Sequence, residues 1–382
     1  MNGGPSAIRI PPACRAARGK AVNEADKRSK IRITVDALRE GMVIAEPVMN
    51  SYGAVVAWQD TPLDAALIHR LRIMGIPWLL VYITEDVQAF SPEARAQWER
   101  AVAVEAFQRS YEEESAAFKD VFLSISEGGQ LELEKTDAIV GSVLAMQNDA
   151  SQIVDCVMQV RSIDEYTYHH CVNVSMLAMM IGRWMRMPEQ DLPALGRAGL
   201  LHDVGKGRVP LAILNKPGSL DEGERAEMKR HAEYGYQILR QTPGVSPEVA
   251  VAVLTHHERE DGSGYPLGLM ADKLSLHAKI LAIADVFDAM TANRTYRRHE
   301  PVFRVFDLMQ NGSFGQLDPI VLEVFLTNIT HYYVGRKVKL SDESVGEVIF
   351  MNRMNFSRPV LQTDRGFVDL MADRGLSIVD LA

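Results

Sequence analysis

The chain has 382 residues, of which 47% are hydrophobic and 24% charged, and its formal net charge at pH 7 is -9. This balance excludes a disordered or fibrous chain, and the negative charge argues against a sequence-independent grip on long nucleic acid. No apolar run approaches the roughly 18 to 20 residues that span a bilayer, so we expect no membrane span. Three cysteines without a CxxC pair favour a reducing, cytoplasmic location over a disulfide scaffold.

The first ninety residues divide into an arm and a small domain. Residues 1–30 carry seven Lys or Arg among Gly and Pro with no apolar period, so we expect a disordered basic arm. The following IRITVDAL alternates as a strand does, and residues 62–74 place leucines at helical spacing. Further strand-like runs occupy 43–48, 54–58 and 78–83. The sequence predicts a small α+β accessory domain over 31–90.

The centre of the chain is predicted to be helical. Long amphipathic stretches occupy 92–126, 135–160, 164–187 and 189–204. The last fifty residues become strand-like again, with VGRKVKL, SVGEVIFMN, RPVLQT and LSIVDL separated by turn residues. We therefore predict a mainly α protein, with a helical linker over 91–150, a helical catalytic domain over 151–330 and a short β-appendage over 331–382.

Six of the ten histidines fall between residues 169 and 257, within the helical centre. His170 lies on an apolar helix face, where a histidine is more often a satisfied core residue than a ligand. LLHDVGK places His202 and Asp203 at the end of an apolar helix, where an unpaired carboxylate is costly and a cation would remove that cost. A buried His-Asp pair is an equal alternative there. Lys206 lies one turn further on and can reach an oxyanion near the same point.

Three more segments carry candidate ligands. His231 opens the helix HAEYGYQIL, and VAVLTHHERE is an apolar helix that ends in His256 and His257. In KILAIADVFDAM, Asp285 is a carboxylate in the middle of an apolar helix and needs a partner. We expect Asp288 beside it to remain near solvent.

Together these residues form a candidate set of five imidazoles and two carboxylates, which is too many for one tetrahedral zinc. The set is His170, His202, Asp203, His231, His256, His257 and Asp285. Mixed nitrogen and oxygen ligands without thiolate favour iron or manganese, with zinc or nickel as alternatives, and a shared carboxylate suits two divalent ions. A centre with two metals clamps the oxygens of a phosphate and activates water, so the set indicates phosphoester hydrolysis.

Three motifs resemble those of the HD-GYP domain, a branch of the HD-domain metal-dependent phosphohydrolases. They are HDVGK at 202–206, HHEREDGSGYP at 256–266 and IADVFDAMTANRTYR at 283–297. The resemblance runs from about residue 150 to about 350, and the 31–90 domain resembles modules that precede HD-GYP domains. It implies a bacterial signalling enzyme that hydrolyses cyclic di-GMP to pGpG, or on to GMP, by a metal-bridging hydroxide at an iron or manganese centre.

The resemblance also implies a role for each candidate residue. One metal would be held by His170, His202, Asp203 and Asp285, and the second by His231, His256 and His257, with Asp203 bridging. Lys206 would bind or polarise the scissile phosphate, and Arg294 would meet a phosphate of the substrate. The loop of Gly264, Tyr265 and Pro266 would lie beside the site and take part in partner binding, for example to a diguanylate cyclase. A tight turn that only positions the preceding histidines is the alternative for this loop.

One departure from the family limits the expected metal content. Members with three metals carry a Glu one turn before the first histidine, where this chain has Tyr166, so we favour two metals. Two other functions stay open: a catalytically weak cyclic di-GMP receptor or scaffold that acts through the GYP face, and an HD phosphohydrolase for another cyclic dinucleotide. The long helical stretch at 92–126 also suggests a homodimer.

Overall fold

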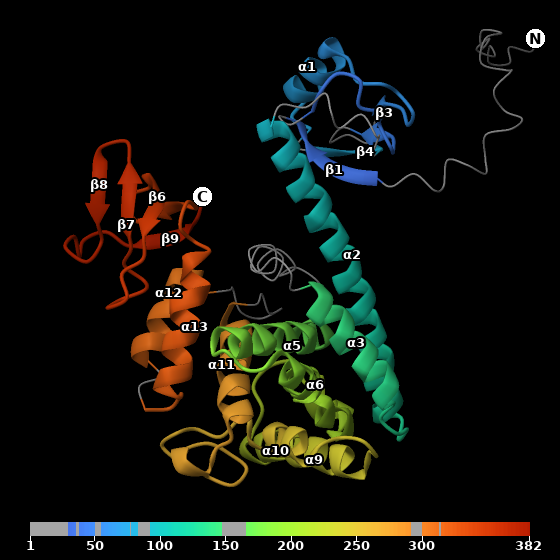
Figure 1. The fold of residues 1–382 in the computed structure, drawn as a ribbon, viewed down its shortest axis with the longest axis vertical. Coiled ribbons are helices and arrows are strands. Elements are labelled where there is room, and N and C mark those ends of the chain that lie inside the picture. The colour runs from blue at the N-terminus through green and yellow to red at the C-terminus, as the bar shows by residue number, and fades with distance from the viewer. Residues whose placement is uncertain are drawn as a thin grey trace, which may run out of the picture. The chain divides into compact units, whose positions relative to one another are not determined.

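The computed structural model describes residues 30–35, 38–49, 55–76, 78–82, 92–146, 166–291, 300–312 and 315–382. The described residues include only Lys30 of the expected arm. They do not include the side chain of Tyr166 or any part of Arg294. The chain divides into two compact units, Met1–Ala106 and Phe107–Ala382. The prediction of a mainly α fold with a strand-containing start and a β-appendage is confirmed (Figure 1).

The described residues of the first unit up to residue 82 form two small antiparallel pairs of strands and one helix. Its elements are β1 (Lys30–Thr34) paired with β4 (Trp78–Tyr82), β2 (Val48–Met49) paired with β3 (Val55–Ala57), and α1 (Ala65–Ile73). Asp64 caps α1 by accepting a hydrogen bond from the backbone N–H of Leu67 at 2.7 Å. Leu71 of α1 packs into an apolar core with Ile33 and Leu79 from the paired strands.

The strand expected at 43–48 is shorter than predicted. Val43 and Ile44 form only isolated bridges, and a bend at residues 45 and 46 separates them from β2. Apolar residues on both sides of the bend are buried, so the hydrophobic pattern was correct although regular pairing stops there.

The second unit is built from helices before its terminal sheet. The α-helices are α2 (Pro92–Ser126), α3 (Leu133–Met146), α5 (Tyr166–Trp184), α6 (Leu192–Leu201), α7 (Leu211–Leu214), α8 (Glu222–Lys229), α9 (His231–Gln241), α10 (Pro247–Thr255), α11 (Leu276–Thr291), α12 (Val302–Asp307) and α13 (Pro319–His331). Short 3-10 segments are η5 (Glu189–Asp191), η6 (Val204–Arg208) and η7 (Ala271–Lys273), and η8 (Leu308–Gly312) is a π-turn. Helix α2 begins in the first unit and continues into the second.

Helix α5 is the centre of this helical packing. It contacts α3, α6, α11 and α13, and every residue from His170 to Gly182 is buried. An α-helix buried on all sides explains the nearly continuous apolar sequence of this stretch. Helices α5 and α6 approach closely at Gly199, where an added Cβ would lie 2.7 Å from the Cα of Ser175. This close packing fixes His170 on α5 relative to the carboxyl end of α6.

The C-terminal appendage is a five-stranded antiparallel sheet in the order β8-β7-β6-β5-β9. Its strands are β5 (Lys337–Leu340), β6 (Val345–Phe350), β7 (Val360–Thr363), β8 (Gly366–Asp369) and β9 (Ile378–Leu381). The sequence predicted four of them, and β8 was missed because its four residues follow a tight turn and alternate weakly.

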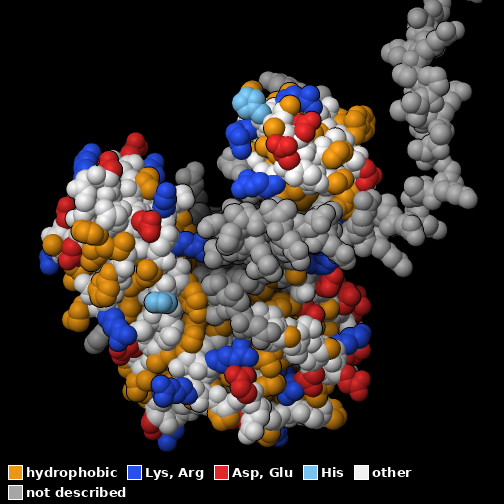
Figure 2. Space-filling view, turned by 45° about the horizontal axis from the view of Figure 1, so that its top comes forward, with side chains coloured by type: hydrophobic (Ala, Val, Ile, Leu, Met, Phe, Trp, Pro, Cys, Tyr) orange, Lys and Arg blue, Asp and Glu red, His pale blue; other side chains and the backbone are white. Residues whose placement is uncertain are grey.

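The described surface carries charges of both signs. Figure 2 shows Lys and Arg side chains interspersed with Asp and Glu among the coloured atoms, without a basic stripe on that face. Across the described part of the chain, no helix combines the length and apolar character of a membrane span.

Candidate metal centre

Seven side chains that the sequence marked as ligands come together in the second unit. They come from α5, from the residues that end α6 and α10, from the start of α9 and from α11. They form two groups, each with ligand atoms within 4.8 Å of one another: Asp203, His231, His256 and His257 in one, and His170, His202 and Asp285 in the other. Helix ends far apart in the sequence thus bring imidazole and carboxylate groups to one buried place.

Three of the histidines are oriented by carbonyl groups at helix ends. The Nδ1 atoms of His202, His231 and His256 lie 2.7, 2.8 and 2.6 Å from the carbonyl oxygens of Gly199, Met228 and Val253. Carbonyls in a last helical turn lack a partner within the helix, and a carbonyl can only accept, so each Nδ1 carries the proton. Each Nε2 therefore presents a lone pair, which is the form of histidine that binds a metal.

These nitrogen atoms face one another in pairs. His202 Nε2 lies 3.2 Å from His170 Nε2, and His231 Nε2 lies 3.4 Å from His256 Nε2. Burial lowers the pKa of His231 and lowers that of His256 well below its ordinary value, so both rings are neutral. The facing lone pairs of His231 and His256 repel each other, and a cation held by both removes the repulsion. The donor set therefore fits a metal ion.

Asp203 faces both groups with different oxygen atoms. Its Oδ1 lies 3.3 Å from His231 Nε2, and its Oδ2 lies 3.3 Å from His202 Nε2. The residue is 1% exposed, and its Oδ1 is buried without a hydrogen bond among the described residues. A buried carboxylate oxygen without a donor is costly unless a cation meets it. Asp203 thus has the placement of a carboxylate that bridges two ions.

Charges within the cluster keep its carboxylates ionised. Burial by itself would raise the pKa of Asp203, but Lys206, His202 and His231 together outweigh burial and hold that pKa well below its ordinary value. Burial also opposes ionisation of Asp285, whose pKa is nevertheless lowered by its hydrogen bond to His170. Burial lowers the pKa of His257 to about 3, so this ring is neutral. Ionised carboxylates and neutral imidazoles are the states that metal binding requires.

His170 retains a proton because it lies between two carboxylates. Burial by itself lowers its pKa, but hydrogen bonds to Asp285 and Asp288 outweigh burial and raise the pKa to about 10. Its Nε2 lies 3.2 Å from Asp285 Oδ1, and its Nδ1 lies 2.7 Å from Asp288 Oδ2. A positive charge is thus already favoured at the place where a metal would bind His170, and metal binding would release this proton.

The expectation that Asp288 remains near solvent was wrong. Asp288 is 2% exposed and accepts hydrogen bonds from His170 and Asn173. Residues three apart on a helix share a face, so Asp285 and Asp288 both point from α11 toward α5. The i, i+3 spacing was the signal in the sequence that could have predicted this burial.

Lys206 lies in the short segment η6, next to Asp203. Its Nζ donates a hydrogen bond to Asp203 Oδ2 at 2.5 Å, and its side chain is 26% exposed. Gly205 lets η6 approach the start of α9, because an added Cβ would lie 1.9 Å from the carbonyl oxygen of His231. Because glycine has no side chain, η6 can pack against α9, and Lys206 thus lies beside Asp203, between the two groups of candidate ligands.

The GYP loop follows α10 and covers part of the group that contains His257. The ring of Tyr265 stacks on His257 with centroids 4.6 Å apart, and Lys229 Nζ lies 4.9 Å from the centroid of the Tyr265 ring. Gly264 passes close to Glu258, since an added Cβ would lie 2.3 Å from its Cα. Pro266 follows Tyr265 through a cis peptide bond.

Glu258 holds this loop, and the sequence did not single it out. The residue is 2% exposed; its Oε1 accepts hydrogen bonds from the backbone N–H groups of Leu267 and Gly268, and its Oε2 from that of Leu269. One buried carboxylate thus satisfies three backbone donors. These donors are nine to eleven residues away in the chain, so a local pattern could not reveal them.

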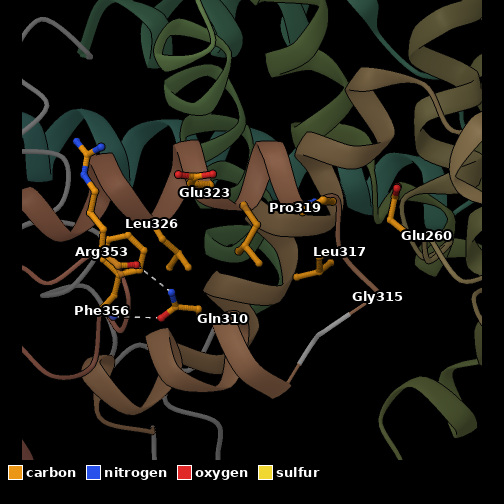
Figure 3. Close-up of a pocket in the computed structure, with 10 residues that line it drawn as sticks. Glu260, Gln310, Gly315, Leu317, Pro319, Glu323, Leu326, Arg353 and Phe356 are labelled. Carbon is orange, nitrogen blue, oxygen red and sulfur yellow. Dashed lines mark hydrogen bonds between the residues drawn. The ribbon is translucent and has the colours of Figure 1, made fainter. Parts of the chain in front are cut away.

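A separate cavity of about 410 Å³ lies between α13 and the C-terminal segment. Its lining includes Leu317, Leu326 and Phe356 as an apolar floor, with Glu260 and Arg353 at its edge (Figure 3). The lining contains none of the seven candidate ligands. The cavity is therefore distinct from the candidate metal centre.

The fold and the cluster define a helical domain whose histidine and aspartate side chains are arranged to hold metal. Residues 146–321 match the HD domain family. The matched part of the chain contains all seven candidate ligands.

Several curated bacterial proteins are similar to this chain. A cyclic di-GMP phosphodiesterase of Pseudomonas aeruginosa is 38% identical over 56% of this chain and 50% of its own length. A 3'3'-cGAMP-specific phosphodiesterase of Vibrio cholerae is 40% identical over 40% of this chain and 33% of its own. A cyclic di-GMP phosphodiesterase of Thermotoga maritima is 35% identical over 50% of this chain and 52% of its own. The matches thus span about half or less of each relative's length.

Proposed function

We propose that the protein is a metal-dependent phosphodiesterase that hydrolyses cyclic di-GMP to pGpG, or on to GMP, and so lowers this second messenger in bacterial signalling. The proposal rests on the placement of Asp203, whose two oxygens face two separate groups of candidate ligands. Two of the relatives bear the name cyclic di-GMP phosphodiesterase.

The metals that we propose are two divalent ions, with iron or manganese favoured over zinc and nickel. The donors are imidazole nitrogens and carboxylate oxygens without a thiolate, which suits iron and manganese. His170, His202 and Asp285 would hold one ion, and His231, His256 and His257 the other, with Asp203 shared. When bound, such ions activate water and neutralise charge on a phosphate diester.

The side chains around the ligands would orient the substrate. Lys206 keeps its charge, since Asp203 outweighs the effect of burial and raises the pKa of the lysine. Its ammonium group, one hydrogen bond from Asp203, would therefore attract the scissile phosphate. Tyr265 covers His257 and would exclude water from that side of the site. Arg294, which lies outside the described residues, is our proposed contact to a further phosphate.

A direct assay tests this proposal. Purified full-length protein, with its metal content quantified, is incubated anaerobically with cyclic di-GMP and either Mn²⁺ or Fe²⁺, and pGpG and GMP are separated by chromatography. We expect metal-dependent product, and a raised KM in Arg294→Ala. Binding of the nucleotide without turnover in the metal-loaded protein would refute hydrolysis and favour a receptor.

A second substrate is supported by the relative that is named a 3'3'-cGAMP-specific phosphodiesterase. Its 40% identity is similar to the 38% of the cyclic di-GMP phosphodiesterase, so sequence identity favours neither substrate over the other. The two substrates are compared in one competition assay. If kcat/KM is higher for cGAMP than for cyclic di-GMP, cGAMP becomes the assigned substrate.

We also propose that the GYP face contacts a protein partner such as a diguanylate cyclase. Leu267 and Met270 beside the loop are 57% and 54% exposed, which is unusual for large apolar side chains in a short segment. Leu267→Asp should weaken binding of a purified cyclase domain in a titration, and equal binding would refute this contact. A homodimer through the stretch 92–126 is tested by sedimentation of the full chain.

A further inference from the structure

We propose that Tyr111, Asn173 and Asp288 form a positioning chain that fixes the ring of the metal ligand His170. The chain begins on α2, in the part of the protein that precedes the HD domain match at residue 146. The inference rests on the proposed metal site, and it adds three residues to that site.

Consecutive hydrogen bonds connect the four side chains. The hydroxyl of Tyr111 donates to Asn173 Oδ1 at 2.8 Å, and Asn173 Nδ2 donates to Asp288 Oδ1 at 2.8 Å. The other oxygen, Asp288 Oδ2, lies 2.7 Å from His170 Nδ1. All four residues are at most 8% exposed, so water does not compete freely for these bonds. The chain thus links α2, α5 and α11 through one buried series of contacts.

The chemistry of the groups fixes the direction of each bond. Carboxylate oxygens accept hydrogen bonds, so Asp288 meets the amide N–H of Asn173 on one oxygen and a ring N–H of His170 on the other. The amide oxygen of Asn173 must then face away from Asp288, and it meets the hydroxyl of Tyr111. With the proton held on Nδ1, Nε2 of His170 is the nitrogen left for the ligand group of His202 and Asp285.

Tyr111 is itself held firmly in place. It is 1% exposed, and its ring lies 6.3 Å from that of Phe107 and 5.5 Å from that of His169, measured between centroids. Its hydroxyl also lies 3.3 Å from the carbonyl oxygen of His169, the residue before the ligand. A change in the position of α2 at Tyr111 would therefore act on both the backbone and the ring of His170.

The chain predicts a graded effect on metal affinity. Hydrogen-bond partners of metal-bound histidines typically change metal affinity by 10- to 100-fold when they are replaced. Asp288→Asn removes the acceptor charge at His170, so we expect a loss of about 10- to 100-fold. Tyr111→Phe removes only the outer hydroxyl and should cause a smaller loss. Ser175→Ala is the matched control. It removes a buried hydroxyl on α5, the helix of His170 and Asn173, and this hydroxyl donates a hydrogen bond to the carbonyl oxygen of Gly196.

The test measures Mn²⁺ affinity of the full-length protein by competition with a chelator, with circular dichroism as the check on folding. We expect Tyr111→Phe to bind Mn²⁺ more weakly than wild type, and Ser175→Ala to bind it as wild type does. Equal affinities of the two folded variants would overturn the proposal. A wild type that binds no Mn²⁺ would overturn it as well.

A double-mutant cycle separates a connected chain from independent packing effects. Asn173→Leu interrupts the chain at its centre with a side chain of similar size. Once it is present, adding Tyr111→Phe should cause no further loss of Mn²⁺ affinity, and additive losses would contradict the chain. Hydrolysis is not read in these titrations, so a protein that binds metal through this chain but cleaves no nucleotide would refute only the proposed function.

Discussion

The two units of the chain bury different kinds of side chain. The core of the first unit, as far as it is described, is apolar, with residues such as Ile44, Leu71 and Val81 at 0 to 1% exposure and no buried charge. The second unit buries Asp203 and Asp288 at 1% and 2% exposure. Buried charge is costly without compensation, so a fold retains it where something other than stability is gained. The first unit thus has an interior that serves stability, whereas the second has an interior whose buried charges fit the metal binding that we propose.

Truncating the apolar core should give the largest loss of stability without affecting the metal site. Leu71 is 0% exposed, and Leu71→Ala should cost about 2 to 5 kcal/mol in the free energy of unfolding of the first unit. Urea unfolding measures this loss, and Mn²⁺ titration of the same variant should match wild type. A weakened Mn²⁺ affinity would show that the two interiors are not independent.

Metal should stabilise the second unit alone. A ligand at 100 times its Kd stabilises the folded state by about 2.7 kcal/mol per site. We expect Mn²⁺ to raise the Tm of the second unit's transition and a chelator to reverse the rise. Once the chelator removes the cation, the lone pairs of His231 and His256 face each other and Asp203 Oδ1 has no hydrogen-bond donor among the described residues. A rise in the transition of the first unit, or no rise at all, would contradict this account.

Loosening the GYP loop should have an intermediate effect. Glu258→Gln replaces a buried carboxyl group that accepts hydrogen bonds from three backbone donors, and a lost buried hydrogen bond costs about 1 to 3 kcal/mol. Hydrogen exchange at the backbone amides of residues 267–269 should accelerate. Glu132→Gln is the control, because Glu132 pairs with Lys135 on the surface and such pairs contribute little. If exchange at all three amides is unchanged in Glu258→Gln, Glu258 does not hold the GYP loop.

The smallest effect is expected at the amino end of α13, outside both interiors. Asp318 caps this helix through the backbone N–H groups of Ile320 and Val321, so Asp318→Ala should cost about 0.5 to 2 kcal/mol at pH 7. Burial opposes ionisation, but these bonds and Lys279 outweigh it and lower the pKa of Asp318 below 3.8. Because the folded pKa is the lower one, this stabilisation is present at neutral pH and is lost as the pH falls through the lowered pKa. The difference between wild type and variant in urea unfolding should therefore shrink in acid, and a constant difference would exclude a contribution of the charge.

The sequence predicted the helical architecture and singled out the candidate ligands that the structure brings together, because both leave local signals. Asp285 interrupts an apolar helix, and His202 and His256 each follow one, and such interruptions can be recognised without a structure. The outer contacts leave no such signal. Tyr111 is 62 residues from Asn173, and their meeting depends on how α2 packs against α5.

The errors in the sequence prediction have the same origin. The polarity of Asp288 predicts exposure to solvent, but this residue shares a helix face with the buried Asp285. The strand expected at 43–48 failed because the apolar pattern shows burial but does not show where a bend interrupts pairing. Local pattern thus predicts which residues are buried better than it predicts which partners they meet.

The most direct test of the account is the metal content and cyclic di-GMP hydrolysis of Asp203→Ala beside wild type, prepared and assayed anaerobically. Asp203 faces both ligand groups, so its loss should reduce the content of both ions and abolish hydrolysis, while the apolar core of the first unit unfolds as in wild type. We expect two metal equivalents and product from wild type only. Full metal content and normal hydrolysis in Asp203→Ala would contradict the assignment of a shared carboxylate at this centre.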